Sequence, residues 1–540
     1  MPVNNSGNNY NVPDDLFDIE LYNKISFIII DALNDSFNEC KKLLEVRDYN
    51  KYQNLVAVFY HHLTKILCSY LFSKYEIDLC NIKHKKELYT LVLTDKSPTL
   101  GFTGFIEYEN VLDDQYLTKE YFNLYQKNNV KTNIKGIMSW VYNELNNKLV
   151  KIINPAAPRV LFTRNMSLDR KYLKKAGWNK KLFLYKDDIK PIKIFIPNFE
   201  DQYDILSQSI QDTIPKLNQL WPTKFEYSQS FLQFIKKDLL THCTSRNSTR
   251  IDADLIVSGC VSQLIARKLA ATAKSLNIPV IDIWHAEETG VIDEPVFGAA
   301  EQTFCDTILG YGDFGCAKLQ KGKYSNGLFE RPRVVSGSSK TVNKLFIDKG
   351  INDFPDISNS TVMYVTTLLR GPKRYGPFMT FHDLAYVSWQ KEMLRYIRDV
   401  FKPKRIIRKA HRKESPQFSF KMEGIVNIKE PDLTDVLSEA DILIYDRPTV
   451  AFVFGAATNK PIIYFDIGIR NFMPDALNSI KERCIYVKGN PKNAESLVRK
   501  AFQDRQKKCV NTFTPKYSLS QDPRSREEIL VDLINDFATA

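Results

Sequence analysis

The chain has no cysteine or histidine pattern of the kind that holds a zinc ion. Its nine cysteines are scattered, with no CxxC pair and no histidine-rich tract. This usage predicts a reducing compartment and argues against a zinc site. His61, His62 and His84 lie among apolar residues at helical spacing, where placement in a core or on a surface is favoured over metal ligation.

Long hydrophobic runs are also missing. No stretch reaches the roughly 18 apolar residues that a membrane-spanning helix needs. The polar start, MPVNNSGNNYNVPDD, lacks the features of a signal peptide. We therefore expect a cytoplasmic protein and leave open a peripheral contact with the inner face of the cell membrane.

Neither charge sign dominates strongly. The chain carries 75 basic and 63 acidic side chains, a net charge of +12. Such an excess suits an anionic ligand or membrane surface, and with no nucleic-acid-binding motif present we expect no nucleic-acid partner. The length of 540 residues exceeds one ordinary core and predicts two or three domains.

Glycine is nearly absent from the first part of the chain, where apolar residues recur at helical spacing. The pattern is clearest in LFDIELYNKISFIIIDALNDSFNECKKLL and NLVAVFYHHLTKILCSYLFSKY, and TDKSPTLGFTGFIEYENVL interrupts it. Composition changes sharply at NPAAPRVLF. We predict a disordered start over residues 1–15 and an α-helical domain over 16–154 that is separable from the rest.

Beyond this boundary, short apolar runs alternate with helical segments, the pattern of α/β proteins. In residues 155–345 the runs predict strands at 160–162, 192–196, 255–257 and 280–283. A second series over 346–515 contains TVMYVTTLL, KRIIRKA, GIVNIKE, ADILIYD, PIIYFD and CIYVKG, and residues 516–540 add a C-terminal helix. Two such series predict two doubly wound, Rossmann-like domains facing across a cleft.

Polar residues follow these strands at the carboxyl ends, where open α/β sheets bind ligands. The loop WHAEETG, after the strand at 280–283, supplies three candidate catalytic residues: His285, Glu287 and Glu288. The second series supplies the candidate nucleotide- and phosphate-binding residues: Arg370, Lys373, Arg408, Lys409, His411, Glu430, Asp446, Arg447, Pro448 and Thr449.

The turn YDRPT favours a phosphate-bearing ligand. The helix that begins near Pro448 presents free N–H groups and a partial positive charge at its amino end. Arg447 and Thr449 add side-chain donors, and Gly455 lets this helix lie close to the sheet. Fixed donors of this kind stabilise a departing phosphate without a metal, so we expect no cofactor. Taken singly, each feature also fits a solvated loop or ordinary helix capping.

The segment EPDLTDVLSEADILIYDRPTVAFVFGAATNKPIIYFD (residues 430–466) resembles the C-terminal domain of GT-B glycosyltransferases that build bacterial surface polymers. That group includes capsule- and lipopolysaccharide-type transferases that use CMP-activated ulosonic acids, such as Kdo or sialic acid, and CDP-glycerol glycerophosphotransferases. IDIWHAEETG is similar to their WHG loop, and RKAHRKE to their R-x-H-P loop. The likeness spans roughly residues 160–510.

The resemblance implies a role for each matching residue. His285 would lie at the reaction centre, Arg408 and His411 at the donor phosphate, and Asp446 and Thr449 at the nucleotide turn. The chain departs from the pattern at three places: Ala286 replaces Gly, Arg412 replaces Pro, and Pro448-Thr449 replaces a Ser-Ser pair.

By the same resemblance, the chain would move a sugar from a nucleotide-activated donor to a bacterial surface glycan, free or lipid-linked. We favour a CMP-activated ulosonic acid as donor, with Glu288 or Glu287 as the base and His285 orienting or sharing protons. The alternatives are a CDP-glycerol-type polyol-phosphate transferase, a UDP-sugar epimerase of the same fold, and a non-catalytic scaffold whose N-terminal helices bind partners.

Overall fold

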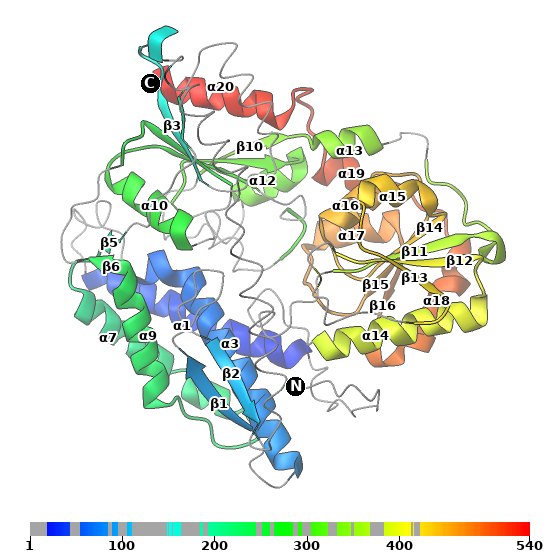
Figure 1. Ribbon diagram of the computed structural model, residues 1–540, viewed down its shortest axis with the longest axis horizontal. Coiled ribbons are helices and arrows are strands. Elements are labelled where there is room, and N and C mark those ends of the chain that lie inside the picture. The colour runs from blue at the N-terminus through cyan, green and yellow to red at the C-terminus, as the bar shows by residue number, and fades with distance from the viewer. Residues whose placement is uncertain are drawn as a thin grey trace.

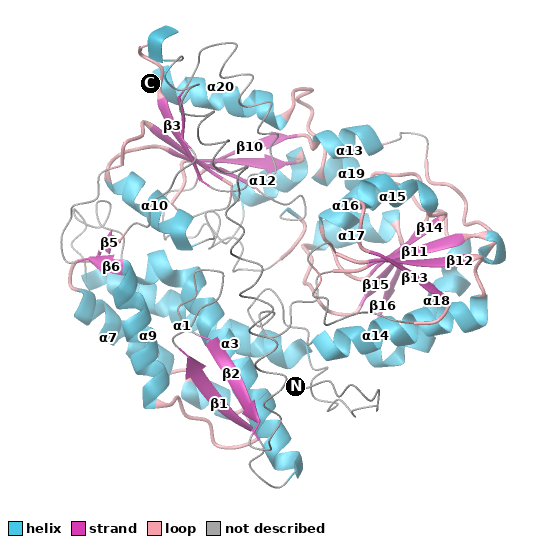
Figure 2. Ribbon diagram, in the orientation of Figure 1, coloured by secondary structure: helices cyan, strands magenta, loops and turns pink. Residues whose placement is uncertain are grey.

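Two six-stranded parallel β-sheets organise the chain, and further helices lie beside the first sheet (Figures 1 and 2). The computed structural model describes residues 19–43, 55–84, 89–94, 105–110, 148, 151–153, 155–163, 184–186, 193–244, 251–259, 264–284, 290–293, 304–321, 332–346, 350–367, 383–411, 414 and 422–539. In that part of the chain, no helix is long and apolar enough to cross a bilayer.

The first sheet has the strand order β10-β9-β8-β7-β3-β4, with every neighbouring pair parallel. Its strands are β3 (Arg159–Thr163), β4 (Leu184–Lys186), β7 (Leu255–Ser258), β8 (Val280–Ile283), β9 (Thr307–Tyr311) and β10 (Arg333–Gly337). The order reverses between β3 and β7, as in doubly wound sheets. β7, β8 and β9 are buried along their whole length, because helices cover both faces of the sheet.

The second sheet has the order β13-β12-β11-β14-β15-β16 and is also parallel throughout. Its strands are β11 (Thr361–Val365), β12 (Arg405–Lys409), β13 (Ile425–Ile428), β14 (Ile442–Tyr445), β15 (Ile462–Asp466) and β16 (Ile485–Lys488). The order reverses between β11 and β14. We call this place the switch point.

Helices pack on both faces of the second sheet (Figure 1). α14 (Asp383–Tyr396) and α18 (Ala494–Gln503) share a core with Val362 and Tyr364 of β11. α16 (Val450–Ala456) and α17 (Pro474–Arg483) share a second core with Met363 and Val365 of the same strand. This alternation along one strand is the period of two that a strand buried on both faces requires. The predicted pair of Rossmann-like domains, the architecture of the GT-B fold, is confirmed.

Two details of the predicted first domain are wrong. The strand predicted over 192–196 is β5 (Ile194–Phe195), which pairs with β6 (Cys243–Thr244) outside the six-stranded sheet. The edge strand is instead β4, which overlaps the apolar run LFLY at residues 182–185 and was not predicted. The interruption within the predicted helical domain is an antiparallel hairpin of β1 (Tyr89–Thr94) and β2 (Phe105–Asn110).

The N-terminal helices do not form a core of their own. α1 (Ile19–Leu43) and α3 (Leu55–His84) pack against α7 (Phe199–Gln211), and α3 also contacts α10 (Leu264–Ser275). One continuous apolar cluster joins these helices to α9 (Gln229–His242) and to one face of the first sheet. The rings of Tyr70 and Phe231 stack with centroids 3.7 Å apart across this boundary.

The last helix, α20 (Arg526–Thr539), returns to the first domain and covers the other face of its sheet (Figure 1). It begins with a capping box, in which the Ser525 N–H donates to Glu528 Oε2 (2.8 Å) and the Glu528 N–H donates to Ser525 Oγ (3.3 Å). The chain therefore crosses between the two domains more than once.

A chain that begins at residue 155 is expected to aggregate, because it would expose the apolar faces of α7, α9 and α10 that α1 and α3 cover. This changes the expectation of a separable helical domain. Size-exclusion chromatography and a circular-dichroism melt test it, with a chain lacking only residues 1–15 as the control. A monodisperse, cooperatively melting fragment would restore the earlier expectation.

Candidate functional site

Polar residues follow both strands at the switch point of the second sheet. Thr366 and Thr367 come directly after β11, and Asp446 and Arg447 directly after β14. Because β11 and β14 are parallel neighbours, these residues meet at one edge of the sheet. The Arg447 guanidinium Nη1 donates to Thr367 Oγ1 at 3.5 Å, so its side chain spans the two strand ends. Open α/β sheets bind ligands at such a place.

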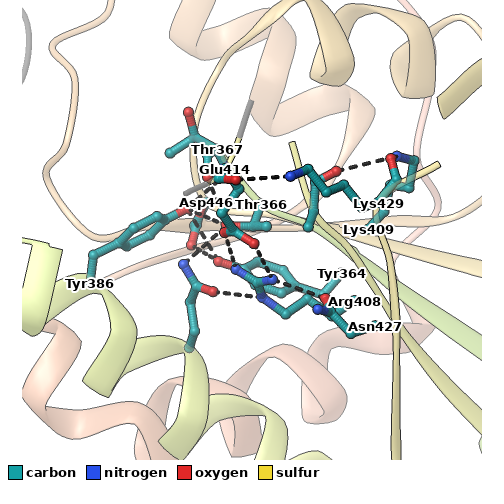
Figure 3. Close-up of polar contacts among 12 residues, drawn as sticks. Tyr364, Thr366, Thr367, Tyr386, Arg408, Lys409, Glu414, Asn427, Lys429 and Asp446 are labelled. Atoms are coloured by element: carbon teal, nitrogen blue, oxygen red, sulfur yellow. Dashed lines mark hydrogen bonds and ion pairs between the residues drawn. The ribbon is translucent and has the colours of Figure 1, made fainter. Parts of the chain in front are cut away.

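The Asp446 carboxylate lies beneath this edge and is buried. It accepts hydrogen bonds from Tyr364 Oη (2.6 Å), Tyr386 Oη (2.7 Å) and Trp389 Nε1 (2.9 Å), as Figure 3 shows for the two tyrosines. Burial, and then the Asp446 charge, raise the pKa of Tyr364 well above its ordinary range, so this hydroxyl stays protonated and donates. Asp446 thus faces the domain interior, where it holds two strands and a helix together, and its implied contact with the nucleotide stays a prediction.

Arg408, on β12, is engaged within the protein. Its side chain is 0% exposed and forms a two-point ion pair with Glu414, at 2.6 and 3.0 Å (Figure 3). It also donates to Gln390 Oε1 and Asn427 Oδ1, each at 3.0 Å. In this structure the Arg408 guanidinium is thus committed to internal partners, and its predicted contact with the donor phosphate stays a prediction.

Lys409 follows the same pattern. Its ammonium group is buried and donates to the backbone oxygens of Lys429 (2.8 Å) and Ala410 (3.2 Å). His411 and Glu430, by contrast, are exposed at the ends of β12 and β13. Among the predicted basic residues Arg408, Lys409 and His411, all of which the structure describes, His411 is the exposed one.

Pro448 and Thr449 lead into α16. Thr449 is the N-cap and is partly exposed, and its hydroxyl makes no capping hydrogen bond. A Cβ at Gly455 would lie 2.2 Å from Tyr445 Oη, which confirms that glycine lets this helix lie close to the sheet. The other end of α16 is held by the buried Arg483, which donates to the Ala456 (3.0 Å) and Thr458 (2.8 Å) carbonyls.

The predicted residues His285, Glu287, Glu288, Arg370 and Lys373 lie outside the described residues. Both ends of the 285–289 loop are nevertheless fixed. At one end, Arg526 donates to the Trp284 carbonyl at 3.0 Å. At the other, the Met473 N–H donates to the Val291 carbonyl at 3.0 Å, and Ile292 forms a β-bridge with Phe472. Residues 285–289 are therefore flanked by Trp284, at the end of β8, and by Val291 and Ile292, which contact the second domain.

Sequence reasoning missed the partners that hold these residues. Tyr386, Trp389 and Gln390 come from α14, far along the chain from β14, and Glu414 follows β12 by five residues. Asp466, at the end of β15, was also missed, and it accepts from Tyr486 Oη and from the Gly468 N–H. The buried polar types on α14 were the signal that could have indicated a network.

No protein-family model matches the chain, and no curated protein matches it. Among solved structures, a glycosyltransferase from Rickettsia africae ESF-5 is similar at 12% identity over 71% of this chain and 98% of that chain, with a TM-score of 0.36. The glycosyltransferase SnogD from Streptomyces nogalater is similar at 10% identity over 71% of this chain and 99% of that chain, with a TM-score of 0.30. UDP-GlcNAc 2-epimerase from Neisseria meningitidis, bound to UDP-GlcNAc, is similar at 11% identity over 70% of this chain and 100% of that chain, with a TM-score of 0.30. At these TM-scores the matches carry no argument about residues, substrate or mechanism.

Glu414→Ala is expected to lower the free energy of unfolding by about 3–5 kcal/mol, because it leaves Arg408 buried without its ion-pair partner. Urea denaturation measures the change. The matched control is Glu439→Ala, which removes the partner of the exposed Arg405 at the start of the same strand and should cost less than about 1 kcal/mol. Equal, small losses in both variants would show that the Arg408–Glu414 pair does not support the sheet.

Proposed function

We propose that the chain is a glycosyltransferase that binds a nucleotide-activated sugar at the switch point of the second sheet. It moves the sugar to a glycan acceptor held on the side of the first domain. The observation that carries the proposal is the Arg447–Thr367 contact across β11 and β14, at the carboxyl ends of parallel strands. A guanidinium fixed there can make paired hydrogen bonds to a phosphate.

The donor phosphate lies, in this proposal, between Arg447, Thr367 and the Thr449 hydroxyl. As the bond from the anomeric carbon to the phosphate oxygen breaks, the electron pair stays on the phosphate and negative charge grows there. Donors fixed before the reaction stabilise that charge without reorganising. Asp446 and Asp466, the described acids at neighbouring strand ends, accept hydrogen bonds from donors within the protein. The phosphate is therefore bound by cationic and hydroxyl groups in this proposal. We therefore propose transfer without a catalytic metal.

The acceptor hydroxyl is deprotonated by Glu288 or Glu287, and its oxygen attacks the anomeric carbon. His285 orients the acceptor or shares its proton. Support comes from the two fixed ends of the loop, at Trp284 and Val291, which join the first domain to the second.

The donor that we propose is a CMP-activated ulosonic acid, and the acceptor a bacterial surface glycan, free or lipid-linked. This finer statement rests on the sequence resemblance. A cytoplasmic site of action, with peripheral contact at the inner membrane face, rests on the cysteine usage and on the lack of a long apolar run. A CDP-glycerol-type polyol-phosphate transferase remains the nearest alternative, followed by a UDP-sugar epimerase.

A donor panel tests this function. The chain is incubated with CMP-Kdo, CMP-sialic acid, CDP-glycerol and UDP-GlcNAc, with and without a glycan acceptor, and with either EDTA or Mg²⁺. We expect acceptor-dependent release of CMP from a CMP-ulosonic acid in both buffers. Turnover of CDP-glycerol would assign the alternative transferase, and acceptor-independent turnover of UDP-GlcNAc the epimerase. Loss of turnover in EDTA with rescue by Mg²⁺ would contradict metal independence.

Arg447→Ala is expected to raise the donor KM by about 10- to 100-fold, because a charge-assisted hydrogen bond contributes about 1.5–3 kcal/mol. The matched control is Arg405→Ala, which removes an exposed arginine from the amino end of the same sheet. Steady-state kinetics and calorimetric nucleotide binding measure both variants. Unchanged nucleotide binding in Arg447→Ala would show that the donor does not bind at the switch point.

Glu288→Gln or Glu287→Gln is expected to lower kcat by about 10²–10⁴, since glutamine keeps the shape of the side chain but cannot accept the proton. Donor affinity should stay close to that of the unmodified chain, and calorimetry with CMP checks it. Near-normal kcat in both variants would place the base elsewhere, with Asp293 and Glu294 as the next residues to change.

A further inference from the structure

Two histidines and an aspartate form a cluster away from the strand ends, where α3 packs beside α9; His62 and Asp238 are buried and His242 is half-buried. His62 comes from α3, while Asp238 and His242 lie one turn apart on α9 and so share a face of that helix. One ligand atom from each residue lies within 4.8 Å of the other two. The side chains of His62 and Asp238 are only 4% and 1% exposed.

Two polar atoms of the cluster have no hydrogen-bond partner among the described residues. His62 Nε2 lies 2.6 Å from Asp238 Oδ2, which is one hydrogen bond. Asp238 Oδ1 and His242 Nε2 are buried, and neither has a hydrogen-bond partner among the described residues. Buried polar atoms nearly always have a partner, because leaving one unpaired is costly. The two atoms therefore indicate that something further binds here.

We propose that His62, Asp238 and His242 bind one divalent transition-metal ion of the zinc class. Imidazole nitrogens and a carboxylate oxygen are ligands that zinc prefers, and three protein ligands leave a fourth position for water. Ligands of a tetrahedral zinc lie about 3.3 Å apart, given bonds of about 2.0–2.1 Å. On binding, the His62–Asp238 pair separates slightly and His242 approaches. The proton between His62 and Asp238 leaves the ligand atoms, for Nδ1 of the same ring when the imidazole is neutral and for solvent when it is an imidazolium.

The surroundings favour a structural role. The Phe59 ring lies near both His62 and His242, with ring centroids 6.4 and 5.9 Å apart, and gives the cluster an apolar side. An ion held by both helices would tie the N-terminal helices to the first Rossmann-like domain. Lys268 Nζ lies 3.4 Å from His242 Nδ1. An ammonium that donates to Nδ1 keeps the ring proton on Nε2, so an ion can bind Nε2 only after this contact is given up and the proton moves to Nδ1. The charge of Lys268 also opposes a cation.

The metal content of the full chain tests the proposal without any measurement of turnover, so its outcome is independent of the proposed function. The chain is purified from cells grown in zinc-supplemented medium, and its metal content is measured by inductively coupled plasma mass spectrometry. We expect about one zinc per chain, and less than about a tenth of that in Asp238→Asn and His242→Gln. The control is His411→Gln, which removes an exposed imidazole in the other domain and should keep the zinc.

A second measurement uses the unmodified chain and decides the matter if a variant fails to fold. The chain is stripped with a chelator and titrated with Zn²⁺ while its melting temperature is followed. We expect binding at one site and a raised melting temperature, because an ion that binds only the folded state stabilises it. Lys268→Met should bind Zn²⁺ more tightly. No uptake by the stripped chain, or equal zinc content in Asp238→Asn, would overturn the proposal.

Discussion

The buried network beneath the switch point is the constraint on which the rest of the second domain depends. Asp446 carries a charge that is costly to bury unless donors surround it. Tyr364 from β11 and Tyr386 and Trp389 from α14 supply those donors and so join two strands and a helix around one carboxylate. Gln390 extends the network by donating to Thr366 and accepting from Arg408. The position of Arg447, one residue beyond Asp446, follows from this arrangement.

Several basic side chains serve the interior of the protein. Arg408 pairs with Glu414 inside the second domain, Arg483 holds the end of α16, and Arg526 ties α20 to the carbonyls of Trp284 and Leu309 in the first. A guanidinium has five donors in a fixed fork, which suits it to join several elements at once. These three arginines are buried, so their charges do not contribute directly to the surface of the protein.

The sequence predicts the sheets well because a parallel strand covered on both faces is a continuous apolar run, as in β14 and β15. It predicts the position of Arg447 for the same reason, since ligands gather where such strands end. The internal contacts of Asp446 could not be predicted, because Tyr364, Tyr386 and Trp389 are distant from it in sequence. Glu414 stands only six residues after Arg408, but residue type alone does not distinguish a ligand contact from an internal pair. The strands β1, β2 and β4 were not predicted, although β1 and β2, with six residues each, are longer than β14 and β15.

The central claim is that a donor phosphate binds at the switch point between β11 and β14. The most direct measurement is a crystal structure of the chain with CMP. The account predicts phosphate oxygens within hydrogen-bond distance of Arg447 and of the Thr367 or Thr449 hydroxyl, with the Arg408–Glu414 pair intact. A nucleotide bound elsewhere, or a phosphate held by Arg408 after its separation from Glu414, would contradict it.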